Sequence, residues 1–222
     1  MDEILEQLKF GVRRFQAEVY PERAEMFAQA ASEPQRPHTL FITCADSRID
    51  PVEITSAGTG DVFVTRNIGN MVPAYGEMLG STSAVIEFAV SGLGVGHVVI
   101  CGHSDCGAMK ALLSPESVEK MPTVKNWLHN AHAALAAADA LYERDQRDGS
   151  GRSLLQELTE QNVLLQLRHL KTHPSVVEAM GAGHLTMSGW VYEIGSGEVR
   201  IARDGQQLFT PIGSAGEKVR RI

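Results

Sequence analysis

The sequence predicts an α/β fold in which a mainly parallel central β-sheet is flanked by helices, with an N-terminal helical arm and a C-terminal edge hairpin. Short apolar runs rich in β-branched residues alternate with longer helix-forming segments, a pattern typical of parallel sheets. With 222 residues, of which 43% are hydrophobic, the chain can bury a core without disulfide bonds. Near the end of the chain, two strand-like runs flank a glycine-containing turn, which predicts the antiparallel hairpin.

The N-terminal segment is expected to be helical. Its apolar residues recur at spacings of three and four, which places them on one face of a helix. These residues are Ile4, Leu8, Val12 and Phe15. A second helix is expected at Pro21, because proline is favoured in the first turn of a helix. We therefore expect a single domain over residues 1–222, with a helical arm at 1–34 and an α/β core at 35–222.

The core is expected to alternate between strands and helices. Strands are predicted at residues 39–43, 61–65, 97–101, 184–194 and 199–202. Helices are predicted at residues 78–90, 105–113, 123–144 and 153–169 and from Pro174, with a polar loop at 145–151. Ser153 and Gln156 form a capping-box pattern where the helix at 153–169 begins. Ligands of open α/β sheets bind at the carboxyl ends of the strands, so the residues that follow the first and third strands are the first candidates for a site.

Composition and charge exclude several classes of protein. The chain has 20 Lys+Arg and 27 Asp+Glu, and the formal charge of −7 argues against a nucleic-acid partner or an anionic membrane surface. No apolar stretch reaches the ~18 residues that a spanning helix needs, and the first residues are acidic where a signal peptide is basic. Three cysteines are too few for a disulfide scaffold. We therefore expect a cytoplasmic protein in a reducing compartment.

Three side chains at two strand ends have the types and spacing of metal ligands. His103 and Cys106 are separated by two residues, a spacing at which a tight turn can direct both side chains to one ion. Cys44 lies at the end of the first strand. Each piece alone has an ordinary explanation, since a strand-end cysteine is commonly a small buried hydrophobe. Their combination at neighbouring strand ends favours a metal site with three protein ligands, which leaves a fourth position for water. Cys101 is expected to be a buried strand residue.

Asp46 and Arg48 follow Cys44 at two and four residues. A carboxylate beside a metal can coordinate the ion or accept a proton from its bound water. An arginine can hold such a carboxylate ionised and oriented. Without the neighbouring cysteine, the same pair would be an ordinary salt bridge within a loop.

These residues resemble the β-class carbonic anhydrase family. Cys44-Ala-Asp-Ser-Arg48 matches the C-x-D-S-R signature of that family, and His103-Ser-Asp-Cys-Gly107 matches its H-S-x-C-G signature. Arg66-Asn-Ile-Gly-Asn70 is similar to its R-N-x-x-N segment. The resemblance covers residues 35–111, with a weaker likeness at 189–192.

The resemblance implies roles for the residues already singled out. Cys44, His103 and Cys106 would hold one Zn²⁺ per chain, and Asp46 and Arg48 would form the catalytic dyad. It also implies a substrate pocket. Gln35 would reach the substrate oxygen across a dimer interface, and the backbone N–H of Gly107 would orient the substrate. The pocket would include an apolar wall for CO₂ formed by Phe63, Ile68 and Phe88. Simple core packing is an equally good explanation for these three apolar residues, and Gln35 could instead be a solvated loop residue.

The activity that the resemblance implies is that of a zinc-dependent carbonate dehydratase. Such a lyase catalyses the reversible hydration of CO₂ to bicarbonate and a proton, through attack of a zinc-bound hydroxide oriented by an Asp–Arg dyad. Family members are dimers or larger oligomers in which N-terminal helices embrace the partner, so a homodimer or homotetramer is expected. The apolar stripe of the first helix could serve this contact or could pack on its own domain.

Three other hypotheses remain open at this point. A related enzyme could hydrolyse another small cumulated substrate, such as carbon disulfide, at the same site. A zinc-dependent regulatory module could have Asp46 permanently in the fourth metal position. A redox protein could use Cys44, Cys101 and Cys106 as thiols; one equivalent of zinc per chain without a titratable thiol pair would exclude it.

Overall fold

A computed structural model describes residues 2–77, 80–148 and 152–213 of the chain. The chain divides into two compact units, Met1–Arg36 and Pro37–Ile222. Among the described residues, no helix is both long and apolar enough to cross a membrane.

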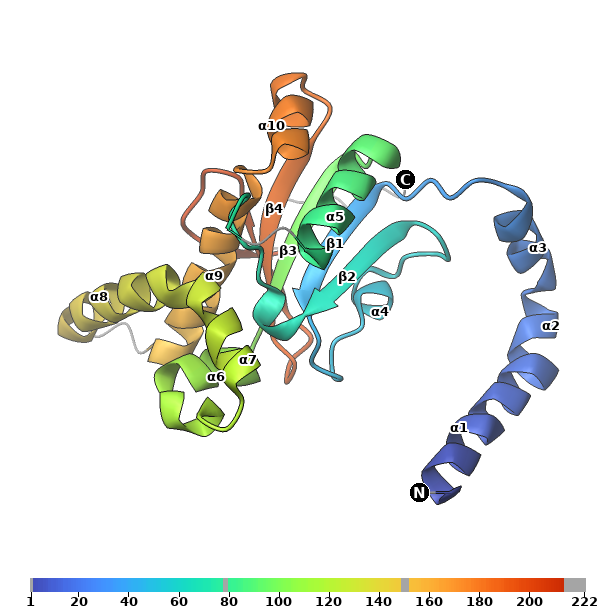
Figure 1. Ribbon diagram of the computed structural model, residues 1–222, viewed down its shortest axis with the longest axis horizontal. Helices are drawn as coiled ribbons and strands as arrows, with labels where there is room; N and C mark the ends of the chain where they lie inside the picture. Colours follow the sequence, from blue (N-terminus) through green and yellow to red (C-terminus); the bar gives the residue numbers. More distant parts are fainter. Residues whose placement is uncertain (1, 78–79, 149–151, 214–222) are drawn as a thin grey trace. The chain divides into compact units, whose positions relative to one another are not determined.

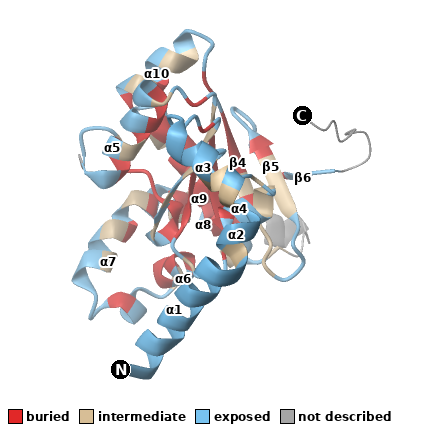
Figure 2. Cartoon of the chain, turned by 90° about the vertical axis from the view of Figure 1, so that its right-hand side faces the viewer, coloured by how far each residue is buried: buried red, intermediate tan, exposed pale blue. Residues whose placement is uncertain are grey.

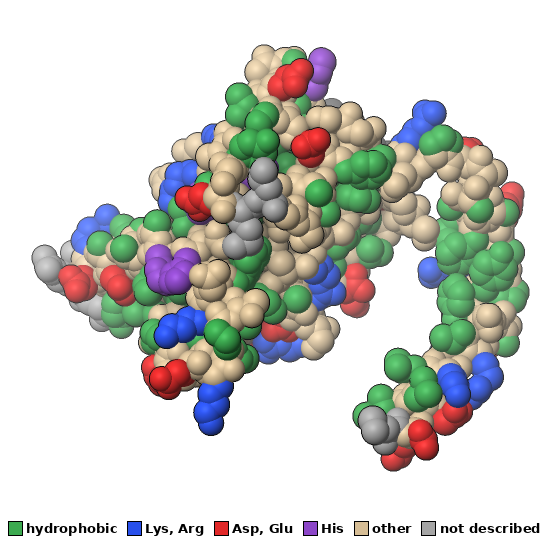
Figure 3. All heavy atoms as spheres, viewed as in Figure 1, with side chains coloured by type: hydrophobic (Ala, Val, Ile, Leu, Met, Phe, Trp, Pro, Cys, Tyr) green, Lys and Arg blue, Asp and Glu red, His purple; other side chains and the backbone are tan. Residues whose placement is uncertain are grey.

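The first unit is helical, as predicted. It contains α1 (Asp2–Arg14), a π-helical turn (Phe15–Val19), α2 (Tyr20–Glu22) and α3 (Ala24–Ser32). α1 begins with acidic and ends with basic side chains, which complements the helix dipole. No residue of α1 is buried, and its apolar side chains are exposed along the unit (Figures 2 and 3).

The second unit is built on one mainly parallel sheet, which confirms the predicted fold class (Figure 1). Within the described residues the strand order is β2-β1-β3-β4-β5-β6. The strands are β1 (Thr39–Cys44), β2 (Val62–Asn67), β3 (His97–His103), β4 (Thr186–Tyr192), β5 (Val199–Arg203) and β6 (Thr210–Pro211). The first four run parallel, and β4, β5 and β6 are antiparallel in turn. The predicted hairpin is β4–β5, but β6 pairs beyond it and therefore forms the edge.

The helices of the second unit follow the predicted order with three differences, the first of which is a short helix at Pro51–Thr55 that was not predicted from the sequence. The helices are α4 (Pro51–Thr55), α5 (Ser81–Glu87), α6 (Gly107–Leu113), α7 (Pro122–Trp127), α8 (His132–Asp148), α9 (Leu154–Leu170) and α10 (Pro174–Gly181). The single helix expected at 123–144 is divided by a 3₁₀ turn at Leu128–Ala131. Tertiary contacts hold this turn, since Trp127 donates to the carbonyl of Ile68 and Gln166 to that of Asn130. α8 also continues to Asp148, so the expected polar loop is shorter, and residues 149–151 lie outside the described residues.

α9 packs closely on the centre of the sheet and forms much of the core (Figure 2). Its start has the predicted capping box between Ser153 and Gln156. Gly102 in β3 and Gly189 in β4 allow the close approach, because a Cβ atom on either would lie 2.8 Å or 2.6 Å from a methyl group of Val163. The opposite face of the sheet carries a smaller buried cluster in which Phe41 makes an edge-to-face contact with Trp190.

Candidate metal centre and active site

The three predicted metal ligands lie together at the carboxyl ends of adjacent parallel strands. Cys44 is the last residue of β1, His103 is the last residue of β3, and Cys106 immediately precedes α6 (Figure 1 shows these elements). One ligand atom from each residue lies within 4.8 Å of the other two, and all three side chains are buried. The Sγ atoms of Cys44 and Cys106 are 4.0 Å apart. The parallel pairing of β1 with β3 therefore brings together ligands that are far apart in the sequence.

One hydrogen bond of His103 fixes the orientation of its ring beside the two cysteines. Nδ1 lies 2.8 Å from the carbonyl oxygen of Ser104, which only a protonated Nδ1 can satisfy. In the neutral imidazole Nε2 then carries the free lone pair, and it is buried without a hydrogen-bond partner among the described residues. A buried acceptor without a partner is costly unless a ligand occupies the space before it. Two thiols and one oriented imidazole form a donor set that suits Zn²⁺, so the residues present fit this ion.

The surroundings of the two cysteines favour thiolate. Hydrogen bonding from Cys106 lowers the pKa of Cys44, against the opposing effect of burial, and the backbone of Gly69 lowers it further. The same contact with Cys44, together with burial, raises the pKa of Cys106, although the backbone of Met109 in α6 acts in the opposite direction. The pair on its own therefore shares one proton, and a divalent cation would favour the loss of that proton as well.

Asp46 and Arg48 form a bidentate ion pair beside the ligand cluster. Arg48 Nε lies 2.9 Å from Asp46 Oδ1, and Arg48 Nη2 lies 2.8 Å from Asp46 Oδ2. Hydrogen bonds from Arg48 hold the pKa of the Asp46 carboxyl well below its usual range. Asp46 Oδ2 also lies 4.0 Å from His103 Nε2, the nitrogen that faces the metal position. The structure thus places an ionised carboxylate next to the candidate metal position.

One further charged residue, Asp105, contacts this pair, and Lys110 contacts Asp105 in turn; neither role was identified from the sequence. Arg48 Nη1 lies 3.1 Å from Asp105 Oδ2, and Lys110 pairs with the other carboxylate oxygen of Asp105. Lys110 and Arg48 lower the pKa of Asp105. The only signal in the sequence was an acidic residue at the variable position of the H-S-x-C-G signature.

The segment that resembles R-N-x-x-N supports the loop that carries Cys44. Arg66 donates from Nε to the carbonyl of Cys44 at 3.0 Å and from Nη2 to that of Asp46. The side chain of Asn67 accepts from the backbone N–H of Met71 and donates to its carbonyl, which closes the turn around Gly69. These residues therefore shape the backbone on which the ligand and the dyad stand.

Buried polar residues of α9 fix the same turn from the other side. Asn162 donates to the carbonyl of Gly69 at 3.0 Å. Gln166 accepts from the backbone N–H of Val72 at 2.8 Å and donates to Asn162. Both side chains are almost fully buried, so each contact is made in a low-dielectric interior. The capping-box pattern predicted the helix that carries these residues but gave no sign of their partners.

The residues predicted to form the substrate pocket lie in several places. The rings of Phe63 and Phe88 are in contact, with centroids 6.0 Å apart, while Phe88 and Ile68 are substantially exposed. Gly107 is the first residue of α6, directly after Cys106, and faces open space. Gln35 is exposed and belongs to the first unit, so its role in the pocket stays a prediction.

Cys101 has the character that the sequence predicted for it. It is fully buried on the face of the sheet opposite α9, beside Phe41 and Val99. Burial raises the pKa of its thiol to about 12. An inert, protonated thiol in this position is a packing residue.

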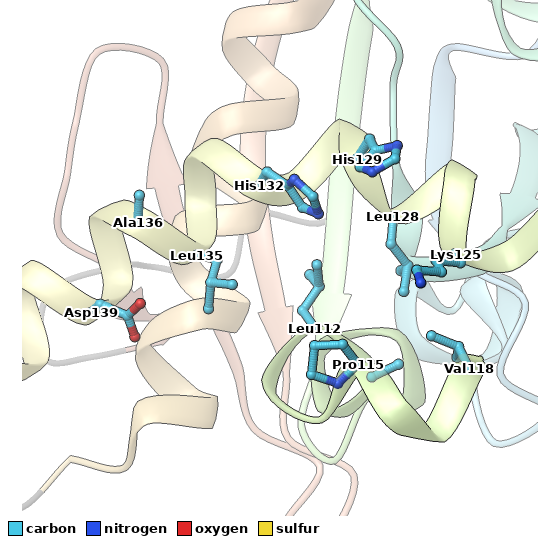
Figure 4. A pocket seen from close by; sticks show the side chains of 11 residues that line it. Leu112, Pro115, Val118, Lys125, Leu128, His129, His132, Leu135, Ala136 and Asp139 are labelled. Atoms are coloured by element: carbon cyan, nitrogen blue, oxygen red, sulfur yellow. The ribbon is translucent and has the colours of Figure 1, made fainter.

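A separate cavity of about 450 Å³ lies between α6 and the α7–α8 segment (Figure 4). Leu112 and Leu128 contribute apolar lining, and His129 and His132 lie on consecutive turns with ring centroids 4.6 Å apart. Burial lowers the pKa of His132. None of the metal-ligand or dyad candidates lines this cavity.

Comparison with known proteins identifies the family of this chain. The carbonic anhydrase family profile matches residues 39–199. A carbonic anhydrase of Pseudomonas aeruginosa is 45% identical over 202 residues, which cover 91% of this chain and 89% of the relative. Carbonic anhydrase 1 of Escherichia coli O157:H7 is 41% identical, covering 91% of this chain and 90% of the relative.

Solved structures agree with the fold. The β-carbonic anhydrase CcaA superposes with a TM-score of 0.87 at 34% identity, covering 96% of this chain and 94% of that chain. A tetrameric β-carbonic anhydrase from Sordaria macrospora gives a TM-score of 0.75 at 28% identity, covering 94% of this chain and 99% of that chain. The chain therefore belongs to the β-class carbonic anhydrase family. Carbonic anhydrases are lyases, and the general reaction of the family is the hydration of CO₂.

Proposed function

We propose that this chain is a zinc-dependent carbonate dehydratase that hydrates CO₂ reversibly to bicarbonate and a proton. The observation that carries the proposal is the juxtaposition of a buried Cys44–His103–Cys106 cluster with an ionised carboxylate, Asp46, 4.0 Å from His103 Nε2. Zn²⁺ bound to these residues would lower the pKa of a water molecule in its open position from ~15.7 towards neutrality.

The chain's own residues would direct that chemistry. Asp46 would accept a hydrogen bond from the attacking oxygen at Oδ2 and so orient its lone pair towards the carbon of CO₂. Arg48 would keep Asp46 ionised and fix its rotamer through the two hydrogen bonds of the bidentate pair.

The remaining pocket assignments belong to the same proposal. Phe63, Ile68 and Phe88 would provide an apolar wall that suits CO₂, which has no net dipole. The N–H of Gly107 and the side chain of Gln35 would contact the substrate oxygen. Support comes from the contact between the two phenylalanine rings and from the position of Gly107 directly after Cys106.

The proposal is tested by metal analysis and stopped-flow CO₂ hydration on the same preparation. We expect one zinc per chain and rapid hydration for the wild type, and loss of both in Cys44→Ala, since two protein ligands hold zinc poorly. Gly181→Ala is a suitable control, because the added methyl group meets no atom within 4 Å. Stoichiometric zinc in Cys44→Ala would refute the ligand set, and a zinc-loaded wild type without hydration activity would refute the reaction.

We further infer that the chain forms a homodimer or homotetramer in which the helical arm, residues 1–34, contacts a second copy. α1 carries exposed apolar side chains that no part of its own unit covers, and a tetrameric relative supports oligomerisation. Light scattering after size-exclusion chromatography should give a dimer or tetramer, and Leu8→Asp with Val12→Asp should shift it towards smaller species. Unchanged mass would refute the role of the arm. The unpaired cysteines and acidic charge support a cytoplasmic location.

A further inference from the structure

We propose that Asp105 is a positioning residue for the reaction. It holds the Arg48 guanidinium in the orientation in which Arg48 makes its two hydrogen bonds to the Asp46 carboxylate. The inference rests on the proposed function, because Arg48 matters to catalysis only if Asp46 does. It assigns a role to the residue that directly precedes the candidate ligand Cys106.

Arg48 is held from two sides by two different loops. Its Nε and Nη2 atoms contact the Asp46 carboxylate at 2.9 Å and 2.8 Å. On the other side, Nη1 lies 3.1 Å from Asp105 Oδ2, and Nη2 lies 3.4 Å from the Asp105 carbonyl oxygen. A planar guanidinium with contacts along both edges has little freedom to rotate, whereas Asp46 alone would let the pair turn together.

Asp105 is itself fixed, so it can serve as an anchor. Its backbone is in the left-handed region, with φ of 60°, which aspartate tolerates better than most residues. The preceding residue, Ser104, donates its N–H to the carbonyl of Tyr192 at 2.9 Å and accepts from the N–H of Ile194 at 3.0 Å. Lys110 on α6 holds the carboxylate oxygen that does not contact Arg48.

The contact between Arg48 and Asp105 matters more for the orientation of Arg48 than for the free energy of folding. The side chains of Arg48 and Asp105 are 45% and 51% exposed, and ion pairs of this kind contribute little to folding. Asp46 Oδ2, by contrast, lies 4.0 Å from His103 Nε2, so a small rotation of the Asp46–Arg48 pair changes where that oxygen points. Reaction rates depend steeply on such placement, with a loss of about 100-fold for ~1 Å.

The experiment compares Asp105→Ala and Asp105→Asn with the wild type, all checked for equal zinc content. We expect Asp105→Ala to lower kcat for CO₂ hydration about tenfold while KM stays within about twofold. Asp105→Asn keeps an acceptor oxygen and should recover most of the loss. Asp50→Ala is the matched control, because Asp50 lies in the same loop as Arg48 but accepts from Val52 and Glu53 at the start of α4.

A double-mutant cycle separates action through Arg48 from other effects. If Asp105 acts by holding Arg48, Asp105→Ala should have no further effect on kcat in an Arg48→Ala background. An equal loss in both backgrounds, or a wild-type kcat in Asp105→Ala, would overturn the proposal. A wild type that holds zinc but does not hydrate CO₂ would instead overturn the proposed function.

A second measurement needs neither activity nor full zinc occupancy. Phenylglyoxal modifies accessible arginines, and peptide mass spectrometry can follow the rate at Arg48 alone. We expect Arg48 to react several-fold faster in both Asp105→Ala and the zinc-free form of that variant than in the corresponding wild-type forms. The rate in Asp50→Ala should equal that of the wild type. An unchanged rate in Asp105→Ala would show that Asp105 does not restrain Arg48.

Discussion

Gly69 combines a left-handed backbone conformation, tight packing and a backbone contact with a candidate metal ligand. Its φ is 74°, and a Cβ atom there would lie 2.9 Å from Ala108 Cβ and 3.0 Å from Met71 Cε. Non-bonded carbons prefer ~3.5–4.0 Å, so Gly69→Ala must displace Ala108, Met71 or the turn itself. Both Gly69 and Ala108 also contribute backbone hydrogen bonds to the cysteines.

The cost of Gly69→Ala has two parts that a control can separate. Alanine in the left-handed region costs about 1–2 kcal/mol, and overpacking of a tight site costs about 1–3 kcal/mol. Gly94 has φ of 69° and no atom within 4 Å of an added Cβ, so Gly94→Ala carries only the first part. We expect Gly69→Ala to be less stable than Gly94→Ala by ~2 kcal/mol.

Urea unfolding at equal protein concentration measures this difference. With an m value near 2 kcal/mol/M, the midpoint of Gly69→Ala should lie about 1 M below that of Gly94→Ala. Competition with a chromophoric chelator should show a zinc affinity ~10–100-fold weaker in Gly69→Ala alone, because the thiolates lose their backbone donors. Equal midpoints and equal zinc affinities in the two variants would refute the reasoning.

Three further variants test other parts of the molecule. Asp46→Asn should keep its zinc but lose at least ~100-fold in kcat/KM by stopped-flow hydration; near-normal activity would remove Asp46 from its proposed role. The pKa of Cys101 is about 12 in the folded chain and ~8.5 in the unfolded chain. The thiol therefore makes its full contribution to the free energy of unfolding below pH ~8.5. This contribution falls as the pH rises, so between pH 7 and 10 the wild type should lose about 2 kcal/mol more than Cys101→Ala in urea titrations; parallel losses would contradict the assignment. Gln166→Leu leaves the N–H of Val72 without its buried partner and should cost about 1–3 kcal/mol, which an unchanged thermal midpoint would disprove.

The metal cluster could be predicted because it depends on local spacing and one rule of sheet topology. His103 and Cys106 are close in sequence, and the carboxyl ends of parallel strands meet at one edge of a sheet. In the structure β1 pairs with β3 in parallel, which brings Cys44 to the same edge of the sheet as His103. Asp46 and Arg48 could be predicted for the same reason, since they lie two and four residues after Cys44.

The parts that sequence patterns did not predict depend on contacts between distant residues. Nothing local distinguishes Asp105 from an exposed loop carboxylate, because its partner Arg48 is 57 residues away. The Ala-rich segment at 123–144 has no proline or glycine after Pro122, so propensity predicts one continuous helix. The 3₁₀ turn that divides this segment is held by hydrogen bonds with distant residues. Trp127 donates to the carbonyl of Ile68, and Gln166 donates to the carbonyl of Asn130. β6, which spans only Thr210–Pro211, is too short to give a period-2 signal.

The separation of the ligands along the chain has a consequence for the unfolded ensemble. Cys44 and Cys106 are 62 residues apart, so an ion held by both would act as a removable cross-link that closes a long loop. By the chain-entropy relation used for disulfides, closing a loop of this length restricts the unfolded chain by about 4 kcal/mol. A chelator would therefore empty the site. In the unfolded chain it would also restore much of the conformational entropy of the segment that joins β1 to α6.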